Sequence, residues 1–396
     1  MDNLKIDWPM RGHDYSEEEI NAVSNVMRSS HDPLTQGFFV RQFEKDLAQY
    51  LDVEEIYSTM SCAHSLELCA MLLQVNSEDE IIIPAHTYCA TAIAFAKKGA
   101  KIVWGDIDSG SLTMSLESIE SLITKKTKAV VIVHLYGLIS PHINEIANLC
   151  KAHNIILIED CAQALGSFYN NRSCGTFGDI ACFSFHAQKN LTTLGEGGAI
   201  RVKNEMQSKL IPGLRLNGHT KFLNQKEDYW LPAMINVEMQ IQNTYPIKST
   251  MNESQGAVGS LILKRLNRLT EERRKRALHY RKELENYEEI VFQSYKTEAA
   301  HSHHLLPIKI KSNKFNRDNM IKNLYDNYGI KSVVQYYPLN RYTLFKEVSH
   351  MEGDLKNTNE FFDNMMSVPF SLIQSWADIE YIIGSIKKTI NELRQP

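Results

Sequence analysis

The sequence predicts an α/β protein in which a mostly parallel sheet, flanked by helices, forms a large domain and a smaller α+β domain follows. Short apolar runs alternate with stretches of helical periodicity in the first half of the chain, which is the pattern of a doubly wound sheet. This pattern breaks near residue 250. The chain has 396 residues, enough for two domains of ordinary size.

Four apolar runs indicate the strands of the large domain. They are continuous rather than alternating, as expected when helices cover both faces of a parallel sheet. The runs are residues 80–84, 101–104, 129–134 and 155–158. Helical patterns lie around them, at residues 65–73, 91–98, 115–123 and 143–152. Sheets of this kind place ligands beyond the carboxyl ends of their strands, so we expect the chemistry there.

The end of the large domain is marked by a polar, aromatic stretch at residues 217–254. A long helix is expected at residues 253–287, and a smaller α+β part from residue 303 onward. We therefore predict an N-terminal arm at residues 1–16, a large domain at 17–250 and a small C-terminal domain at 251–396.

Composition excludes several classes of function. The formal net charge of −4 argues against a general nucleic-acid binder, and the basic run at residues 264–281 is interleaved with glutamates, as on a solvated helix face. The seven cysteines form no spaced framework, which predicts reduced, buried thiols in a cytoplasmic protein. No apolar stretch has the length of a signal peptide core or a membrane span, so no membrane partner is expected.

Asp160 and Lys189 are the first candidates for chemistry. Asp160 follows the last predicted strand, where it can face the ligand crevice or cap the next helix. Lys189 lies in an apolar, glycine-rich segment, residues 183–198. A surface lysine in a loop is the simpler interpretation. A desolvated lysine, however, is a nucleophilic amine suited to forming a Schiff base.

Two further segments complete a cofactor site. Small residues at 61–65 precede a helix whose free N–H groups can hold a phosphate, and Tyr88 follows another strand, where its ring can stack on a planar heterocycle. A carboxylate, a lysine, a phosphate cradle and an aromatic ring are what pyridoxal phosphate needs. A carboxylate about 3 Å from the ring nitrogen stabilises its positive charge by roughly 5 kcal/mol at an effective dielectric near 20.

Three motifs resemble the DegT/StrS-type sugar aminotransferases, a family with the type I aspartate-aminotransferase fold. They are Pro-Leu-Thr-Gln-Gly at residues 33–37 followed by Phe43-Glu44, Glu-Asp-Cys-Ala-Gln-Ala at 159–164 followed by Gly166, and the segment 183–198. The resemblance covers nearly the whole chain. It implies pyridoxal phosphate as cofactor and a homodimer whose active sites are shared between subunits.

The resemblance also implies roles for individual residues. Lys189 would form the Schiff base and shuttle the proton, and Asp160 would pair with the pyridine nitrogen. The remaining cofactor contacts would come from Gln163 at the ring hydroxyl, Tyr88 stacked on the ring, and Ser184 with the backbone of Ala63 and His64 at the phosphate. His186 would line the pocket or pack as a core histidine.

The implied reaction moves an amino group, with L-glutamate as the expected donor, to a keto- or aldehydo-sugar. Family base rates favour a nucleotide-linked keto-sugar of cell-surface polysaccharide or lipopolysaccharide biosynthesis. Two departures leave an alternative open. Cys62-Ala63 replaces the usual Gly-Thr at the phosphate turn, and Lys248-Ser249-Thr250-Met251 replaces an Asn-Tyr-Arg-Met-like segment that reaches the neighbouring subunit. Lys248 is either solvated or faces a partner's site. In that site, with His64, it would suit an oxidised eight-carbon sugar acid, 8-oxo-3-deoxy-octulosonate, which would become the 8-amino sugar.

Two other interpretations were weighed. A sugar dehydratase of the same fold is one, but related dehydratases carry histidine at the position of Lys189. A metal site at His301, His303 and His304 is the other, because alternate histidines on a strand share a face. Surface histidines explain these three more simply, so no metal is expected. The segment 335–339 resembles the part of the small domain that closes over the substrate.

Overall fold

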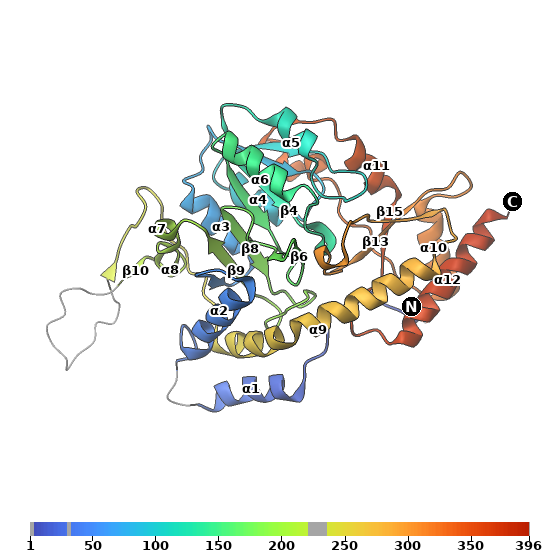
Figure 1. Ribbon diagram of the computed structural model, residues 1–396, viewed down its shortest axis with the longest axis horizontal. Coiled ribbons are helices and arrows are strands. Elements are labelled where there is room, and N and C mark those ends of the chain that lie inside the picture. The colour runs from blue at the N-terminus through green and yellow to red at the C-terminus, as the bar shows by residue number, and fades with distance from the viewer. Residues whose placement is uncertain (1–3, 30–32, 221–235, 396) are drawn as a thin grey trace.

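The computed structural model describes residues 4–29, 33–220 and 236–395 (Figure 1). Its centre is an eight-stranded sheet. In spatial order the strands are β1 (Tyr57–Thr59), β9 (Gly198–Val202), β8 (Ile180–Ser184), β5 (Ile156–Asp160), β4 (Thr127–Val133), β2 (Glu80–Pro84), β3 (Lys101–Gly105) and β14 (Ser349–Glu352). All neighbours pair in parallel except β9, which is antiparallel to both β1 and β8. The predicted mostly parallel sheet is confirmed, and the four predicted strands are β2 to β5.

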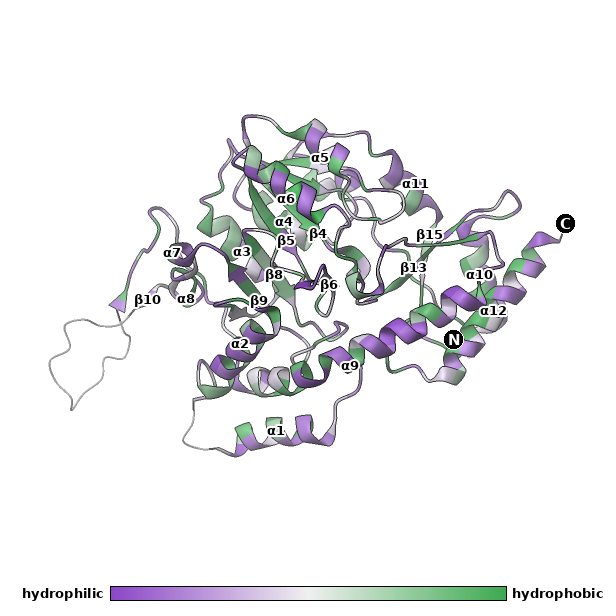
Figure 2. Ribbon diagram, viewed as in Figure 1, coloured by the Kyte–Doolittle hydropathy of each residue, from purple (hydrophilic) through white to green (hydrophobic). Residues whose placement is uncertain are grey.

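Helices cover both faces of this sheet, which explains the continuous apolar runs. Ile82 of β2 packs with the core under α2, α5, α6 and α9, whereas Ile81 and Ile83 pack with the core under α3 and α4. In Figure 2 the strands between these layers are mostly green. The helices of this part are α1 (Glu17–Arg28), α2 (Phe38–Leu51), α3 (Cys62–Leu72), α4 (Ala90–Ala96), α5 (Leu116–Leu122), α6 (Ile143–Ala152), α7 (Glu205–Ser208) and α8 (Ile211–Leu214). A 3-10 turn, η1 (Leu135–Gly137), follows β4, and two short antiparallel pairs flank the sheet, β6 (Phe168–Tyr169) with β7 (Arg172–Ser173) and β10 (His219–Thr220) with β11 (Asn236–Val237).

The long helix α9 (Glu253–Glu283) runs from the large sheet to the C-terminal part (Figure 1). It begins where predicted, because Asn252 and Gln255 form a capping box, and it ends four residues before the predicted limit of 287. Helices α1 and α2 lie against its N-terminal half.

The C-terminal part has its own core around a three-stranded antiparallel sheet of β12 (Ile290–Phe292), β13 (Leu306–Ile310) and β15 (Met365–Val368). Its helices are α10 (Arg317–Tyr328), α11 (Lys356–Asn364) and α12 (Trp376–Arg394), with 3-10 turns η2 (Glu298–Ala300), η3 (Leu339–Arg341) and η4 (Thr343–Phe345). Strand β14 leaves this part and pairs with β3 at the edge of the large sheet. The domain boundary near residue 250 stays a prediction. Of the polar stretch 217–254, residues 221–235 lie outside the described residues.

Two expectations about polar side chains were wrong. The basic run at 264–281 is not simply a solvated face, since Arg273 and Arg276 are 1% and 8% exposed. Both guanidinium groups donate to backbone carbonyls of distant segments. The three histidines expected at the surface, His301, His303 and His304, are buried.

The cysteines behave as predicted in one respect. All seven are free thiols, and all but Cys89 are buried. No helix in the three described stretches of the chain is both long and apolar enough to cross a membrane.

Candidate functional site

A cavity of about 440 Å³ opens at the carboxyl ends of the parallel strands. Its walls come from the segments that follow β1, β2, β4, β5 and β8, together with Gln335 and Tyr336. The carboxyl ends of the parallel strands are where a doubly wound sheet places its ligands. The predicted residues that line it are Ala63, Tyr88, Asp160, Gln163, Ser184, His186 and Lys189. The fold therefore brings together seven residues from four separate segments of the sequence.

Asp160 ends β5 at the buried end of the cavity and is 4% exposed. Its Oδ2 accepts a hydrogen bond from the Thr91 hydroxyl at 2.9 Å, and its Oδ1 accepts one from the backbone N–H of Ala162 at 3.1 Å. Burial raises the pKa of Asp160 above its ordinary value, although these hydrogen bonds and nearby Lys189 oppose the shift. The carboxyl group of Asp160 is thus desolvated and held in one orientation.

Lys189 lies in the loop between β8 and β9. Gly195 and Gly197 in this loop have φ of 112° and 159°, and a Cβ at Gly197 would lie 2.0 Å from Oγ1 of Thr193. The glycine-rich composition of the segment thus reflects a tight turn. Burial lowers the pKa of the Lys189 amine, and Asp160 offsets this only in part. A lowered pKa is what burial is expected to produce at a lysine that acts as a neutral amine.

The N-terminal arm fixes the same loop from outside. The N–H of Gly12 donates to the carbonyl of Ala187 at 3.0 Å, and the amide of Gln188 donates to the carbonyl of Pro9 at 2.9 Å. A Cβ at Gly12 would lie 2.3 Å from the carbonyl oxygen of Lys189. The arm therefore packs directly on the backbone that carries the lysine.

Gln163 is held by two hydrogen bonds. Its Oε1 accepts from the backbone N–H of Tyr136 at 2.6 Å, and its Nε2 donates to the hydroxyl of Tyr336 at 2.7 Å. Tyr336 belongs to the segment 335–339 and also lines the cavity. Burial raises the pKa of its hydroxyl, so this group is a neutral hydrogen-bonding partner. The C-terminal part of the chain thereby closes one wall of the cavity.

The proposed phosphate end lies at the start of α3. Ser61 caps this helix, and its hydroxyl accepts from the backbone N–H of His64 at 3.3 Å. Ala63 and Ser184 line the cavity here. The His64 side chain is instead turned to Ser61, with Nδ1 2.9 Å from Oγ, and His64 is not among the lining residues.

Of the three remaining predicted residues, Tyr88 and His186 line the cavity and Lys248 does not. Tyr88 is 59% exposed at the cavity wall, with its ring edge-to-face with that of Tyr336. His186 lines the cavity, and its Nε2 lies 4.0 Å from the carboxylate of Glu196. Lys248 is exposed and does not line this cavity.

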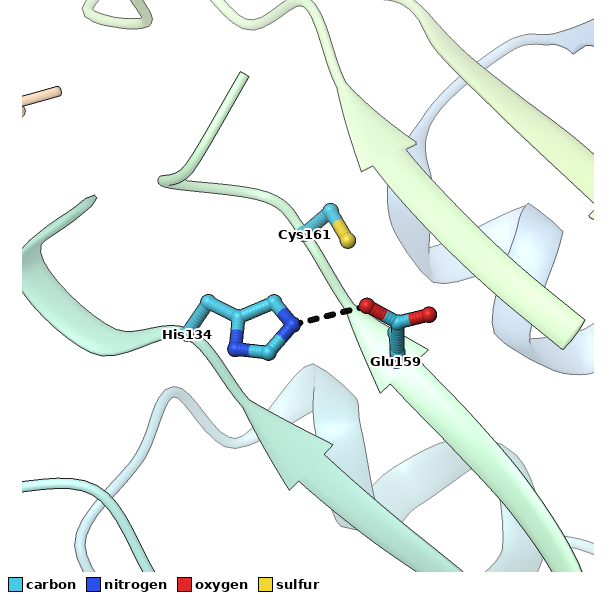
Figure 3. A group of neighbouring side chains, drawn as sticks. All are labelled: His134, Glu159 and Cys161. Atoms are coloured by element: carbon cyan, nitrogen blue, oxygen red, sulfur yellow. Dashed lines mark hydrogen bonds and ion pairs between the residues drawn. The ribbon is translucent and has the colours of Figure 1, made fainter. Parts of the chain in front are cut away.

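Glu159 and Asp160 are successive residues of β5, so their side chains point to opposite faces of the sheet. Figure 3 shows Glu159 beside His134 and Cys161. His134, Glu159 and Cys161 have potential ligand atoms within 4.8 Å of one another, and the picture shows the imidazole pointing at the carboxylate. The carboxylate accepts hydrogen bonds from Nε2 of His134 and from the backbone N–H groups of Gly175, Phe177 and Gly178. Nδ1 of His134 accepts from the Ser140 N–H. Hydrogen bonding thus accounts for this cluster, which anchors the loop before β8.

The sequence did not point to Thr91, which lies beside Asp160. Tyr336 was predicted only as part of the segment 335–339, without its contact with Gln163, and His304 was expected at the surface rather than beside Lys189. Helical spacing does not relate Thr87 to Thr91, because α4 begins at Ala90 and Thr87 lies before it. Their hydroxyls lie 3.2 Å apart. The contact of His304 with Lys189 joins residues 115 positions apart, and no local pattern announces it.

The geometry fits pyridoxal phosphate. A buried carboxylate, a desolvated amine, a fixed amide and an aromatic ring converge on one cavity of suitable volume, with a helix N-terminus beside them.

Comparison with known proteins agrees with this geometry. The sequence matches the DegT/DnrJ/EryC1/StrS aminotransferase family over residues 13–387. It is 29% identical to GDP-perosamine synthase of Vibrio cholerae over 318 residues, which are 80% of this chain and 81% of that protein. It is 27% identical to dTDP-3-amino-3,6-dideoxy-alpha-D-galactopyranose transaminase of Aneurinibacillus thermoaerophilus over 376 residues, 94% of this chain and 96% of that protein.

A solved structure gives the same result. The PLP-form of Spr1654 from Streptococcus pneumoniae superposes with a TM-score of 0.84 at 28% identity, covering 97% of this chain and 99% of that one. PLP here denotes pyridoxal phosphate. The chain therefore belongs to the DegT/DnrJ/EryC1/StrS aminotransferase family and is an aminotransferase that uses pyridoxal phosphate.

Proposed function

We propose that this enzyme transfers an amino group from L-glutamate to a keto-sugar linked to a nucleotide, in the biosynthesis of a cell-surface polysaccharide or lipopolysaccharide. The observation that carries the proposal is the desolvated amine of Lys189 in one cavity with the buried carboxylate of Asp160. The names of the two relatives support a nucleotide-linked sugar as acceptor, since one names a sugar linked to GDP and the other a sugar linked to dTDP.

Lys189 and Asp160 have distinct roles in this proposal. Lys189 would bind the cofactor covalently through Nζ and, once free, take a proton from the substrate carbon and return it to the cofactor. Its lowered pKa favours the neutral amine that this work requires. Asp160 would stabilise a proton on the ring nitrogen. The bound cofactor supplies an electron sink, and the anion of Asp160 keeps that sink strong.

The other predicted residues would orient the cofactor. Gln163 would hydrogen-bond the ring hydroxyl. Its Nε2 already donates to the hydroxyl of Tyr336, and both residues line the cavity. Ser184 and the backbone N–H groups of Ala63 and His64 would hold the phosphate at the start of α3. The backbone N–H of His64 donates to the Ser61 hydroxyl, so this N–H would be shared between Ser61 and the phosphate. Tyr88 would cover one face of the ring.

An oxidised eight-carbon sugar acid, 8-oxo-3-deoxy-octulosonate, is the second candidate acceptor. Its carboxylate would need a cation, and Lys248 is exposed and free to meet a partner subunit's cavity. Lys248→Ala distinguishes the two acceptors. A rise in KM confined to the sugar acid favours this candidate. If turnover and KM are unchanged with both acceptors, Lys248 is a solvated surface residue.

A sugar dehydratase is the third candidate. Lys189 argues against it, because the related dehydratases carry histidine at this position. Glutamate separates the reactions: a transaminase converts the cofactor to its amine form and releases 2-oxoglutarate, whereas a dehydratase releases water from the sugar.

We also propose a homodimer. Two large hydrophobic side chains near the cavity are exposed. Tyr88, in the cavity wall, is 59% exposed, and Met60, next in sequence to the lining residue Ser61, is 47% exposed. A partner chain over the cavity would bury such side chains. Light scattering of the holo-protein at micromolar concentration measures the mass directly, and a monomer would contradict the shared site.

The test of the whole proposal is a labelling and turnover experiment on the holo-protein. Borohydride reduction followed by peptide mass spectrometry should place the cofactor on Lys189. In a separate, unreduced sample of the holo-protein, glutamate should shift the absorbance to the amine form with stoichiometric 2-oxoglutarate, and a nucleotide-linked keto-sugar should restore the starting spectrum. The absence of label at Lys189 would overturn the proposal.

A further inference from the structure

The side chains of His304 and Lys189 meet beside the cavity. Nζ of Lys189 lies 3.5 Å from Nε2 of His304, although the two residues are 115 positions apart. Within residues 4–29, 33–220 and 236–395, His304 is the hydrogen-bonding partner that the structure gives to this amine. Asp160 acts on the amine through its charge and favours the protonated form of Lys189.

His304 is 4% exposed, and burial holds the pKa of its imidazole well below the usual range. The charged groups that face it are Lys189, Arg273 and His186, and all three also disfavour its protonated form. The imidazole is therefore neutral at physiological pH. A neutral imidazole keeps a lone pair, and a lone pair on Nε2 can accept from an ammonium group.

The backbone of His304 is fixed to the same elements as the lysine loop. Its N–H donates to the carbonyl of Tyr136 at 2.9 Å, and its carbonyl accepts from Nη1 of Arg273 at 3.3 Å. Nη2 of Arg273 donates to the carbonyl of Gly12, and Gly12 packs on the backbone of Lys189. The imidazole and the amine are thus held against each other by one network.

A packing role alone does not explain this residue. Nδ1 of His304 is buried and has no hydrogen-bonding partner in the described part of the chain. Leaving a buried polar atom unpaired costs free energy that leucine at this position would not cost.

We propose that His304 is a positioning residue, whose Nε2 accepts a hydrogen bond from Lys189 whenever the amine is not bound to the cofactor. The proposal rests on the role given to Lys189 above. In both half-reactions the released amine must stay close to the reacting carbon while it holds and returns a proton. His304 keeps it at one place in that interval, and because His304 is neutral it adds no second cation to the site.

The experiment measures the proton affinity of Lys189 in the cofactor-free protein. Trace acetylation at a series of pH values, read by peptide mass spectrometry against an internal standard, gives the pH midpoint for this single lysine. His304→Leu removes the acceptor, so the ammonium form is less stable and the midpoint should fall by about one pH unit or more. His304→Gln keeps an acceptor and should restore the midpoint, whereas His304→Asn is too short and should behave like leucine.

His301→Leu is the matched control. His301 is a buried histidine three residues away that contacts Gln293 and His303 and has no contact with the amine. It should lower the thermal stability and leave the midpoint unchanged. In the holo-enzymes, His304→Leu should lower kcat about tenfold or more with little change in KM, and His304→Gln should recover most of it.

An unchanged midpoint in both His304→Leu and His304→Asn would overturn the proposal, as would a rise in the midpoint. If His304→Leu does not fold, the midpoints of His304→Asn and His304→Gln are compared instead, and equal midpoints in these two variants would overturn the proposal. The acetylation measurements use no cofactor, so they are independent of the borohydride labelling. Missing label at Lys189 removes the proposed function, whereas an unmoved midpoint removes only the role of His304.

Discussion

The hydroxyl of Thr91 donates a hydrogen bond of 2.9 Å to Oδ2 of Asp160, and both side chains are buried. Thr91 lies in the first turn of α4, and Asp160 ends β5, so the bond joins two elements on the same side of the cavity. This hydrogen bond fixes the orientation of the Asp160 carboxylate and favours its ionised form.

Thr91→Val should therefore make the enzyme more sensitive to acid. Without this donor the pKa of Asp160, already raised by burial, rises further. In the proposed function Asp160 acts as an anion, so activity should be lost as the pH falls through its pKa. The acidic limb of kcat/KM should move up by about one pH unit. The pH profile of Thr389→Val, which removes a buried hydroxyl in α12, is the control and should match wild type. An unshifted acidic limb would disprove the role of Thr91.

Lys189→Ala should abolish covalent attachment of the cofactor and reduce turnover by about 10²- to 10⁴-fold, because a positioned proton carrier is lost. Steady-state assays with glutamate measure the decrease. Lys189→Arg is the matched variant, since it keeps a cation of similar length but a much weaker nucleophile. It should be as inactive as the alanine variant. Near-normal turnover by either variant would contradict the assignment.

Glu159→Gln should lower the free energy of unfolding by about 2–3 kcal/mol, since a buried carboxylate that accepts four hydrogen bonds is replaced by an amide. Burial alone would raise the pKa of Glu159, but His134 and the backbone donors more than offset it, and the net shift is downward. The stabilisation is thus fully present above the pKa of an unfolded glutamate, near 4.3, and is lost as the pH falls through the lower folded value.

Urea denaturation between pH 3 and 7 measures this effect. The difference between wild type and Glu159→Gln should shrink at the acid end. Glu145→Gln, on the exposed side of α6, is the control and should be within about 0.5 kcal/mol of wild type. A difference that is independent of pH would refute the ionic part of the argument.

Arg273→Met should destabilise the protein by about 2–3 kcal/mol, because the carbonyls of Gly12, His303 and His304 lose their donor. Burial and the neighbouring Arg276 lower the pKa of Arg273 to about 9, so part of its charge is lost at alkaline pH. Chemical denaturation at pH 7 measures the loss. Arg268→Met, an exposed arginine on the same helix, should be nearly neutral. Equal stabilities for the two variants would show that the contacts of Arg273 contribute nothing.

The central strands could be predicted because their signal is local. Each of β2 to β5 is an uninterrupted apolar run, and burial on both faces requires that composition. Lys189 and Asp160 could be singled out for a similar reason, since each is an ionisable residue set in an apolar segment. Motif resemblance then supplied Gln163 and Ser184, which no local pattern distinguishes.

The buried basic residues could not be predicted in the same way. Arg273 sits in a run that reads as solvated, and its burial depends on Gly12 and His304, which are distant in the sequence. The three histidines near residue 303 are also buried by segments far along the chain. Nε2 of His304 lies 3.5 Å from Nζ of Lys189, and the carbonyls of His303 and His304 accept from Nη1 of Arg273. Periodicity carries no information about such partners.

Strand β14 has a consequence for how this chain can be divided. It covers the outer edge of β3, where the indole N–H of Trp104 donates to the hydroxyl of Ser349, and the ring of Trp104 packs against Phe345. A fragment cut near residue 250 would uncover the N–H and C=O groups of β3 together with a large aromatic ring. Bare strands of this kind pair with other chains, so the truncated protein should aggregate rather than fold as an independent unit.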